Sequence, residues 1–335
     1  MRRAMLMLVV LTVLALVVTL AGCSGGNGAP DGATMDAAKK PPPQPPPPPP
    51  DPTECKIVFN LETGHARKRA LHIFTINTDG TDLQQLTDGP GMNYDPAWSP
   101  DGQWLCYSYA PVLGSATREL YRMPSDGGEV EQLTSLGGRN EWPAWSPDGA
   151  RIAFSHAGAI AVLDLNSMVV TDLTELGWSG YAMDYSPKWS PDGATIIFGA
   201  RVGPNATYET LHTVPSTTQG APHDPVPVVP GGRWVDWCHV EDGGQSQITY
   251  TIAYGLYIAT VDSAGVLVAG SEQQIAVPTR ATMPAWAPDG SAIVYNSLDD
   301  DSLYIVDPAG EEDVQQLCAA GWYPPDWSPP VFGNE

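Results

Sequence analysis

The residue patterns that usually mark a reactive centre are missing from this sequence. A serine hydrolase needs a G-x-S-x-G turn to expose its nucleophile, and the nearest match, Gly177 to Tyr181, lacks the final glycine. No phosphate-binding loop, H-E-x-x-H or C-x-x-C motif occurs, and the six histidines are scattered along the chain. We therefore predict no enzymatic activity, no catalytic residue, no zinc site and no cofactor.

One acidic run could in principle bind a hard cation. Three consecutive aspartates, Asp299 to Asp301, stand between two stretches of strand-forming residues. They lack the alternating ligand spacing and the central glycine of a calcium-binding loop. We predict no metal site there.

Aromatic, acidic and amide side chains recur just before a repeated tryptophan. Such a mixture can bind a peptide, a folded partner or a sugar chain, because the rings supply contact area and the polar groups supply hydrogen bonds. The alternative is that the rings only cover the edges of a sheet. The candidate partner-binding residues are Tyr94, Asp95, Glu141, Trp142, Asp184, Tyr185, Arg233, Trp234, Trp322 and Tyr323.

The tryptophan that follows these residues begins a repeated pentapeptide. Three copies read W-S-P-D-G and a fourth reads W-A-P-D-G, while one copy is degenerate and one is truncated. Successive tryptophans are 47, 44, 48, 49 and 41 residues apart, close to the length of one four-stranded propeller blade. We interpret these tryptophans as packing residues of the blades. They are Trp98, Trp145, Trp189, Trp237, Trp286 and Trp327.

Each pentapeptide is expected to form the turn of a β-hairpin. Proline presets φ, aspartate suits the next turn position, and glycine takes the left-handed position. A third strand such as Glu119 to Met123 and a fourth such as Val130 to Thr134 complete the unit. The strands predicted directly after the turns are Trp104 to Tyr109, Arg151 to Ser155, Thr195 to Gly199, Ile248 to Ile252 and Ala292 to Asn296.

Counting the strands indicates how the blades close into a ring. Cys55 to Asn60 matches a second strand, with Leu71 to Asn77 and Leu83 to Thr87 as the third and fourth, so the first blade lacks its inner strand. Trp322 to Ser328 can supply it, and closure removes the exposed sheet edges. The sequence therefore predicts an all-β fold, a six-bladed β-propeller closed by a C-terminal strand that completes the first blade.

The W-S-P-D-G motif followed by an apolar strand resembles the WD-type repeat of the TolB propeller, over about Cys55 to Ser328. Related repeats occur in the propellers of prolyl-oligopeptidase-like and tricorn-type peptidases. The resemblance implies a binding module that presents the mouth of its central funnel to an envelope protein. TolB-like proteins carry an α/β domain before the propeller, whereas a proline-rich segment stands here, so the Tol-Pal role is not carried over.

The first 22 residues have the pattern of a lipoprotein signal peptide. Arg2 and Arg3 precede an apolar run from Met5 to Leu20, which is shorter than the roughly twenty residues of a transmembrane anchor. By resemblance to bacterial lipoproteins, Cys23 would become the acylated N-terminus. Ser24 after it favours the outer membrane, with the protein facing the periplasm or the cell surface.

A tether and a single propeller are expected to follow the signal peptide. Ser24 to Thr53 carry no apolar periodicity, and the run from Pro41 to Pro50, broken only by Gln44, favours a polyproline II spacer of about 30 Å. We predict a lipidated cysteine and a disordered tether over residues 23–54, and the propeller over residues 55–335.

The net charge of the chain makes some classes of binding partner unfavourable. With 38 acidic and 16 basic residues, the formal net charge of -22 would repel nucleic acid and acidic glycans. The basic cluster from His65 to Arg69 is interpreted as a solvated loop. We expect an envelope protein or peptide as the partner, with membrane contact through the lipid anchor only.

Two other functions remain open at this point. Some proteins with this repeat are oligogalacturonate lyases, so a polysaccharide-binding or lyase-like propeller acting on an envelope or extracellular glycan is the alternative. A passive envelope scaffold without a specific ligand is the third.

Overall fold

A computed structural model describes residues 55–64, 69–175, 184–202, 208–309, 314–319 and 323–329. All of them belong to one unit of the chain, Pro48–Glu335. The predicted signal peptide, Cys23, the predicted tether and Trp322 lie outside the described residues. Every regular element in the described part is a β-strand, so the prediction of an all-β fold is confirmed. An apolar helix of membrane-spanning length does not occur among these residues.

Four of the sheets contain four strands each, joined antiparallel in chain order. The first consists of β8 (Asn140–Trp145), β9 (Arg151–His156), β10 (Ala159–Asp164) and β11 (Val169–Asp172). The second consists of β12 (Asp184–Trp189), β13 (Thr195–Val202), β14 (Tyr208–Pro215) and β15 (Val226–Pro230). The third consists of β16 (Arg233–Asp242), β17 (Gln245–Ile252), β18 (Gly255–Asp262) and β19 (Gln273–Ile275). The fourth consists of β20 (Ala281–Trp286), β21 (Ile293–Ser297), β22 (Ser302–Val306) and β23 (Gln315–Ala319).

The remaining strands form one eight-stranded sheet with two halves. One half contains β4 (Met92–Trp98), β5 (Trp104–Ala110), β6 (Glu119–Pro124) and β7 (Glu131–Gln132). The other contains β24 (Asp326–Trp327), β1 (Lys56–Thr63), β2 (Ala70–Asn77) and β3 (Gln84–Gln85). A single parallel bridge between Leu71 and Met92 joins the halves. Each half therefore repeats the four-stranded pattern of the other sheets.

Strand β24 lies beside β1, although the two are far apart in the sequence. Trp327 pairs with Ile57 and Asp326 with Val58, in antiparallel register. The backbone N–H of Ser328 donates to the carbonyl of Lys56 at 2.7 Å, and its hydroxyl accepts from the N–H of Lys56 at 2.8 Å. The last described strand thus supplies the first strand of this group.

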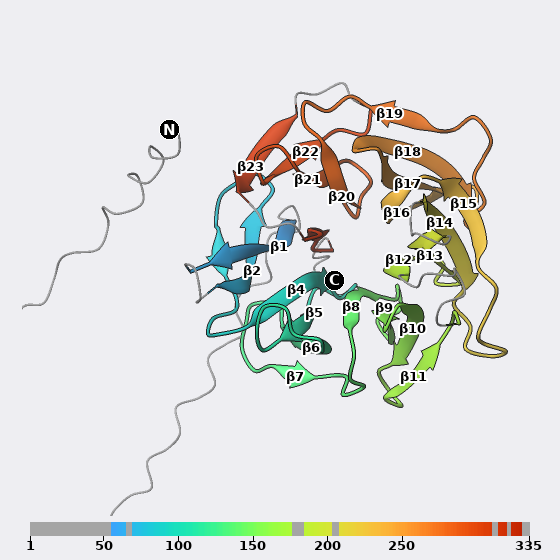
Figure 1. Ribbon diagram of the computed structural model, residues 1–335. Coiled ribbons are helices and arrows are strands. Elements are labelled where there is room, and N and C mark those ends of the chain that lie inside the picture. The colour runs from blue at the N-terminus through green and yellow to red at the C-terminus, as the bar shows by residue number, and fades with distance from the viewer. Residues whose placement is uncertain are drawn as a thin grey trace, which may run out of the picture. The chain divides into compact units, whose positions relative to one another are not determined.

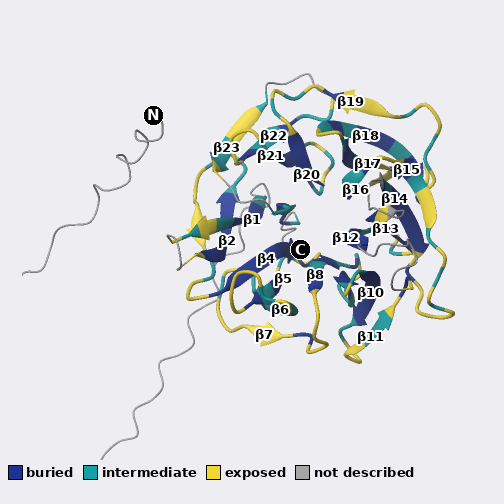
Figure 2. Cartoon of the chain, viewed as in Figure 1, coloured by how far each residue is buried: buried dark blue, intermediate teal, exposed yellow. Residues whose placement is uncertain are grey.

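The sheets stand around a common centre, with one strand of each group innermost (Figure 1). Contacts between inner strands run from β4 to β8, β12, β16, β20 and β24, and β24 also contacts β4. The outermost strands are the most exposed (Figure 2), as the burial of β3, β7 and β19 shows. Residues that precede a motif tryptophan are therefore carried by the inner strands or, before β24, by the segment that leads into it.

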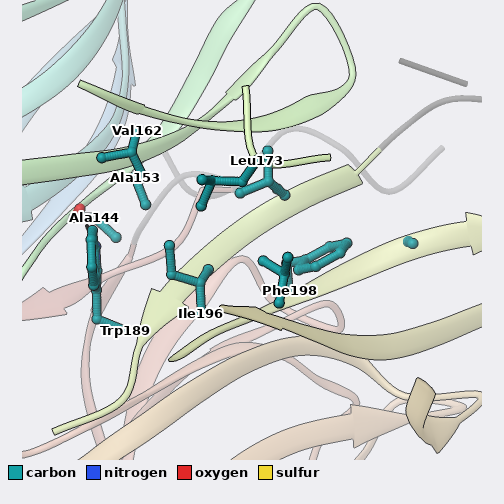
Figure 3. Packing of buried hydrophobic residues seen from close by; sticks show 10 residues of the cluster. Ala144, Ala153, Val162, Leu173, Trp189, Ile196 and Phe198 are labelled. Carbon is teal, nitrogen blue, oxygen red and sulfur yellow. Dashed lines mark hydrogen bonds between the residues drawn. The ribbon is translucent and has the colours of Figure 1, made fainter. Parts of the chain in front are cut away.

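The core lies between the faces of neighbouring sheets. Figure 3 shows one such layer, in which Ile196 and Phe198 of β13 meet Val162 of β10. Trp189 packs in the same layer and is 2 % exposed. Its indole Nε1 donates to the carbonyl of Ala144 on the neighbouring sheet at 3.0 Å. The motif tryptophan thus joins two sheets by packing and by a hydrogen bond, as expected for a blade-packing residue.

The pentapeptide forms the predicted hairpin turn. In the first copy the N–H of Gly102 donates to the carbonyl of Ser99 at 2.9 Å. The Ser99 hydroxyl donates to Asp101 at 2.6 Å and accepts from the N–H of Trp104 at 2.9 Å. Gly102 has a φ of 69°, a backbone conformation that residues with a Cβ atom rarely adopt. The strands expected after the turns are confirmed within a few residues.

A bulge interrupts each of five inner strands, and the sequence patterns considered above do not predict it. The register between inner and second strand shifts after Tyr94, Glu141, Tyr185, Arg233 and Thr282. The next residue in each strand has a left-handed φ between 48° and 54°. A bulge turns the side chains on its two sides in different directions. Each inner strand therefore presents one set of residues before the bulge and another just before the tryptophan.

Candidate functional site

The inner strands carry candidate residues at both ends. We call the end with the residues three to five positions before each tryptophan the entry end. The end with the tryptophan and the following turn is the motif end. The two sets are about three residue steps apart, which corresponds to roughly 10 Å along a strand. The described residues among those predicted to bind a partner all belong to the entry end.

One half of the entry end is a charged and aromatic cluster. The rings of Tyr94 and Tyr323 meet edge-on with their centroids 5.0 Å apart. The Arg118 guanidinium lies 3.7 Å from the centroid of Tyr94 and pairs with Glu141 at 2.5 Å. Asp95 accepts a hydrogen bond from the N–H of Trp142 at 3.3 Å. The cluster joins β4, β8 and the segment before β24.

Asp95 is the least favourably placed carboxyl in this cluster. It is 2 % exposed, and its Oδ1 atom has no hydrogen-bond partner among the described residues. Burial and the nearby Glu141 carboxylate raise the pKa of Asp95 to about 7, against the opposing influence of Arg118. The carboxyl is therefore partly protonated near neutral pH.

The other half of the entry end is an aromatic triad, Trp142, Tyr185 and Trp234. The ring centroids lie 5.8 Å apart for Trp142 and Tyr185, 4.9 Å for Tyr185 and Trp234, and 6.3 Å for the two tryptophans. Tyr185 is 4 % exposed, whereas both tryptophans are half-buried. These three rings come from β8, β12 and β16, which are more than 40 residues apart in sequence.

A glycine on the neighbouring strand leaves space for the ring of Tyr185. A Cβ atom added to Gly199 on β13 would lie 2.6 Å from the Tyr185 ring. Beside the triad, Glu209 forms ion pairs with Arg201 at 3.1 Å and with Arg233. The ring of Tyr185 is thus fixed by a glycine beneath it, and Arg233 is held by a carboxylate.

The structure divides the ten predicted partner-binding residues by exposure. Five of them are buried, namely Tyr94, Asp95, Glu141, Asp184 and Tyr185. Four are half-buried and reach solvent, namely Trp142, Arg233, Trp234 and Tyr323. Trp322 lies outside the described residues. The buried five support the surface that the other four present.

The motif end encloses a pocket of about 250 Å³ that sequence reasoning missed. Every inner strand contributes to its lining, chiefly with tryptophan and proline side chains of the repeated motif. Four ionisable side chains also line it, namely Lys188, Asp236, His239 and Asp326. Three of the four occupy the position just before, or two after, a motif tryptophan in the degenerate and truncated copies.

The charged groups in this pocket form one ion pair and leave one carboxylate in excess. Lys188 Nζ lies 3.1 Å from Asp236. Asp236 also accepts from the N–H of Trp286 at 2.7 Å, and Asp326 accepts from the N–H of Trp98 at 2.8 Å. Burial raises the pKa of Asp326 to about 6, with Lys188 opposing and Asp236 adding to the shift.

Lys188 remains a cation in this setting. Burial acts to lower its pKa, but Asp236 and Asp326 outweigh that influence, and the pKa of Lys188 is raised. An ammonium group held by a carboxylate in a pocket walled by aromatic rings is a fixed charge rather than a proton donor. The pocket can therefore bind a charged group.

A charged residue directly before a motif tryptophan changes the hydrogen bonds between neighbouring sheets. Where alanine precedes the tryptophan, its carbonyl accepts from the next indole N–H, as for Trp145 with Ala97 at 3.2 Å. Where aspartate stands there, its carboxylate takes the next backbone N–H, and the indole Nε1 atoms of Trp98 and Trp286 have no acceptor among the described residues. A charged residue directly before a motif tryptophan is the signal that could have revealed the pocket.

The described residues contain no group of three or more histidine, cysteine, aspartate or glutamate side chains that could hold a metal ion. The aspartate run contacts its own surroundings instead. Asp299 pairs with Arg280 at 2.7 Å, and Asp300 accepts from the Tyr304 hydroxyl at 2.7 Å.

Four-stranded groups around a shared pocket, with a W-S-P-D-G or related hairpin after every inner strand except β24, define a β-propeller. The family is shown by a sequence model that matches residues 48–226, described as the TolB beta propeller domain. The chain belongs to this TolB beta propeller family.

Two solved structures show the same fold. TolB from Acinetobacter baumannii has 20% sequence identity and a TM-score of 0.61, over 82% of this chain and 66% of that chain. A chain of a nidogen/laminin complex has 12% identity and a TM-score of 0.61, over 82% of this chain and 98% of that chain. At these identities the likeness is one of fold. No curated protein matches the chain.

Proposed function

We propose that this protein is an exported, lipid-anchored propeller that holds a protein of the cell envelope at its entry end. Membership in the TolB beta propeller family supports a binding role, since such propellers present a rigid surface rather than reactive groups. The signal-peptide pattern and Cys23 support export and anchoring to a membrane. The proline-rich tether gives the propeller reach from that membrane.

The proposal includes a ring of six blades closed between the first and last blades. Its support is the pairing of Trp327 with Ile57 and of Asp326 with Val58, together with the lining of one pocket by all of the inner strands. Counting β24 with β1, β2 and β3 gives six four-stranded groups among the described strands. A closed ring keeps the entry-end residues at fixed positions.

The observation that carries the binding role is the exposure of Trp142 and Trp234 beside the buried Tyr185. Tryptophan rings that are packed on one side and open on the other are typical centres of protein interfaces. The glycine beneath Tyr185 and the carboxylate that holds Arg233 fix the neighbouring side chains before a partner arrives. Such preorganisation lowers the entropy cost of association.

The test is capture of the partner in intact cells. Crosslinking of the full-length protein, followed by identification of the joined protein, should give a specific envelope partner. Replacing both Trp142 and Trp234 by alanine should lower the yield by about tenfold or more, because interface tryptophans each contribute roughly 2 kcal/mol or more. Tyr185 is left intact because it is buried and its loss would disturb the fold.

A matched variant carries the same change at the motif end. Trp104→Ala removes a half-buried tryptophan at the start of β5, where its ring stacks with Arg122. This variant should retain the crosslinked partner. Equal yields from the double variant and the unmodified protein would rule out the aromatic triad as the binding surface.

Anchoring is tested separately through Cys23. Cys23→Ala removes the thiol that would carry the lipid, so the protein should no longer incorporate a labelled fatty acid. Gel analysis of the labelled, purified protein measures the change. Equal labelling of this variant and the unmodified protein would contradict a lipid on Cys23 and leave the propeller's binding role unaffected.

A further inference from the structure

The pocket at the motif end differs chemically from the aromatic surface at the entry end. Its walls are the rings of motif tryptophans and the prolines that follow them. Its charged groups are Lys188, Asp236 and Asp326, with His239 solvent-exposed beside them. Nothing in the proposed binding of a partner at the entry end uses these groups.

The pocket has two carboxylates and one ammonium group, so one carboxylate lacks a cationic partner of its own. The Lys188 ammonium is committed to Asp236 at 3.1 Å, and Asp236 is only 7 % exposed. Asp326 has the N–H of Trp98 as a hydrogen-bond donor, which satisfies part of a carboxylate but does not neutralise it. A carboxylate in an apolar enclosure is stabilised when a cation joins it.

The walls favour an organic cation over a hydrated metal ion. Tryptophan faces attract ammonium and guanidinium groups, and tryptophan and proline side chains contact an alkyl chain. Asp236, Asp326 and His239 all line the pocket, but the described residues contain no group of three such side chains that could hold a metal ion. A volume of about 250 Å³ lies below the roughly 300 Å³ typical of the smallest drug-sized sites, so the ligand is small.

We infer that the motif-end pocket is a binding site for an alkylammonium or alkylguanidinium group, with Asp326 as the carboxylate that pairs with it. The cation enters beside Lys188 and Asp236, and its alkyl chain lies against the tryptophan and proline walls. A free amine or guanidine and the side chain of a lysine or arginine share this chemistry.

Calorimetry on the full chain in detergent and phosphate buffer tests the inference. The probes are n-butylammonium and n-butylguanidinium, with 1-pentanol as a neutral probe of similar size. The two cations should bind and raise the melting temperature, whereas the alcohol should bind at least about tenfold more weakly. Equal binding of the alcohol, or no binding of either cation at millimolar concentration, would overturn the inference.

Two variants of the same chemical type locate the binding site. Asp326→Asn keeps the shape of the side chain and should weaken binding of n-butylammonium by about tenfold or more. Asp126→Asn removes one carboxylate from an exposed turn and should leave the affinity unchanged. Equal affinity of the Asp326→Asn variant and the unmodified protein would exclude Asp326 as the pairing group.

A third variant tests the pocket through its effect on stability. Lys188→Met removes the resident ammonium, so its melting temperature should fall because Asp236 loses its partner. Ethylammonium should restore part of the loss, and ethanol should not. Equal effects of the two additives would contradict a cation site at this position.

A blocked lysine, Nα-acetyl-lysine amide, separates the two sources of ligand. Binding comparable to that of n-butylammonium assigns the pocket to a side chain of a protein. Binding of the free amine without the blocked lysine assigns it to a small molecule. Failure of the entry-end crosslinking experiment does not affect either result, because the two sites lie at opposite ends of the inner strands.

Discussion

Several ionisable side chains of this protein are buried, and burial disfavours their charged form. At the entry end the pKa of Asp95 shows this effect most strongly. The pKa of Asp95 rises from 3.8 to about 7, so the folded protein binds a proton that the unfolded chain releases between these values. Its contribution to stability is full below about pH 4 and is lost as the pH rises toward 7. The groups around it are Glu141, Arg118 and Arg139, together with two tyrosines.

Asp95→Asn should therefore stabilise the protein at pH 8. The amide keeps an oxygen acceptor for the Trp142 N–H but carries no charge, and one pKa unit corresponds to about 1.4 kcal/mol. We expect a gain of roughly 1 to 3 kcal/mol at pH 8 and little change at pH 4, measured by urea unfolding. The general repulsion among acidic groups is common to both proteins, so the difference between them reports on Asp95. A variant equally stable or less stable at pH 8 would contradict this account.

At the scale of elements, the motif tryptophan is the joint between neighbouring sheets. Trp189→Ala should cost about 3 to 5 kcal/mol of unfolding free energy, because it empties part of the layer between β10 and β13. Trp189→Phe keeps much of the packing but loses the hydrogen bond to Ala144, and should cost about 1 to 2 kcal/mol. Thermal or urea unfolding measures both variants. Equal losses would show that the hydrogen bond, rather than the packing, dominates.

The elements themselves were largely predictable from sequence. The W-S-P-D-G turn has a local cause in proline, aspartate and glycine, so the hairpins and the family of the fold are confirmed. The bulge was missed, although its signal is present: proline stands two residues before most motif tryptophans, as at Pro96 and Pro143. Proline within a strand marks a bulge or an edge because it cannot donate to the ladder.

The sites were less predictable than the elements. Alternation along one strand cannot tell whether Lys188 or Asp326 faces solvent or a pocket that strands from the whole chain build together. The entry-end residues could be listed because they share a place in the repeat. Their division into buried supports and exposed rings depends on neighbours such as Gly199, which contacts Tyr185 only in the folded sheet.

At the scale of the whole molecule, the proposed closure predicts a cost for losing β24. A chain truncated after residue 322 lacks the strand that pairs with β1 and the carboxylate that binds the Trp98 N–H. We expect a lower melting temperature and association through the uncovered edge of β1, seen by size-exclusion chromatography. Truncation after Pro329 keeps β24 and should have neither effect. A monomeric and equally stable shorter chain would contradict closure through this strand.

The hydrogen bonds between Lys56 and Ser328 join residues 272 positions apart, and this has a consequence for the order of assembly. A ribosome makes β1 long before β24, so the first sheet waits with an uncovered inner edge while the other sheets form. Contacts of such long range are made late and slow the final folding step. A chaperone that binds newly made chains is therefore expected to act on β1 in the interval before residue 327 has been synthesised.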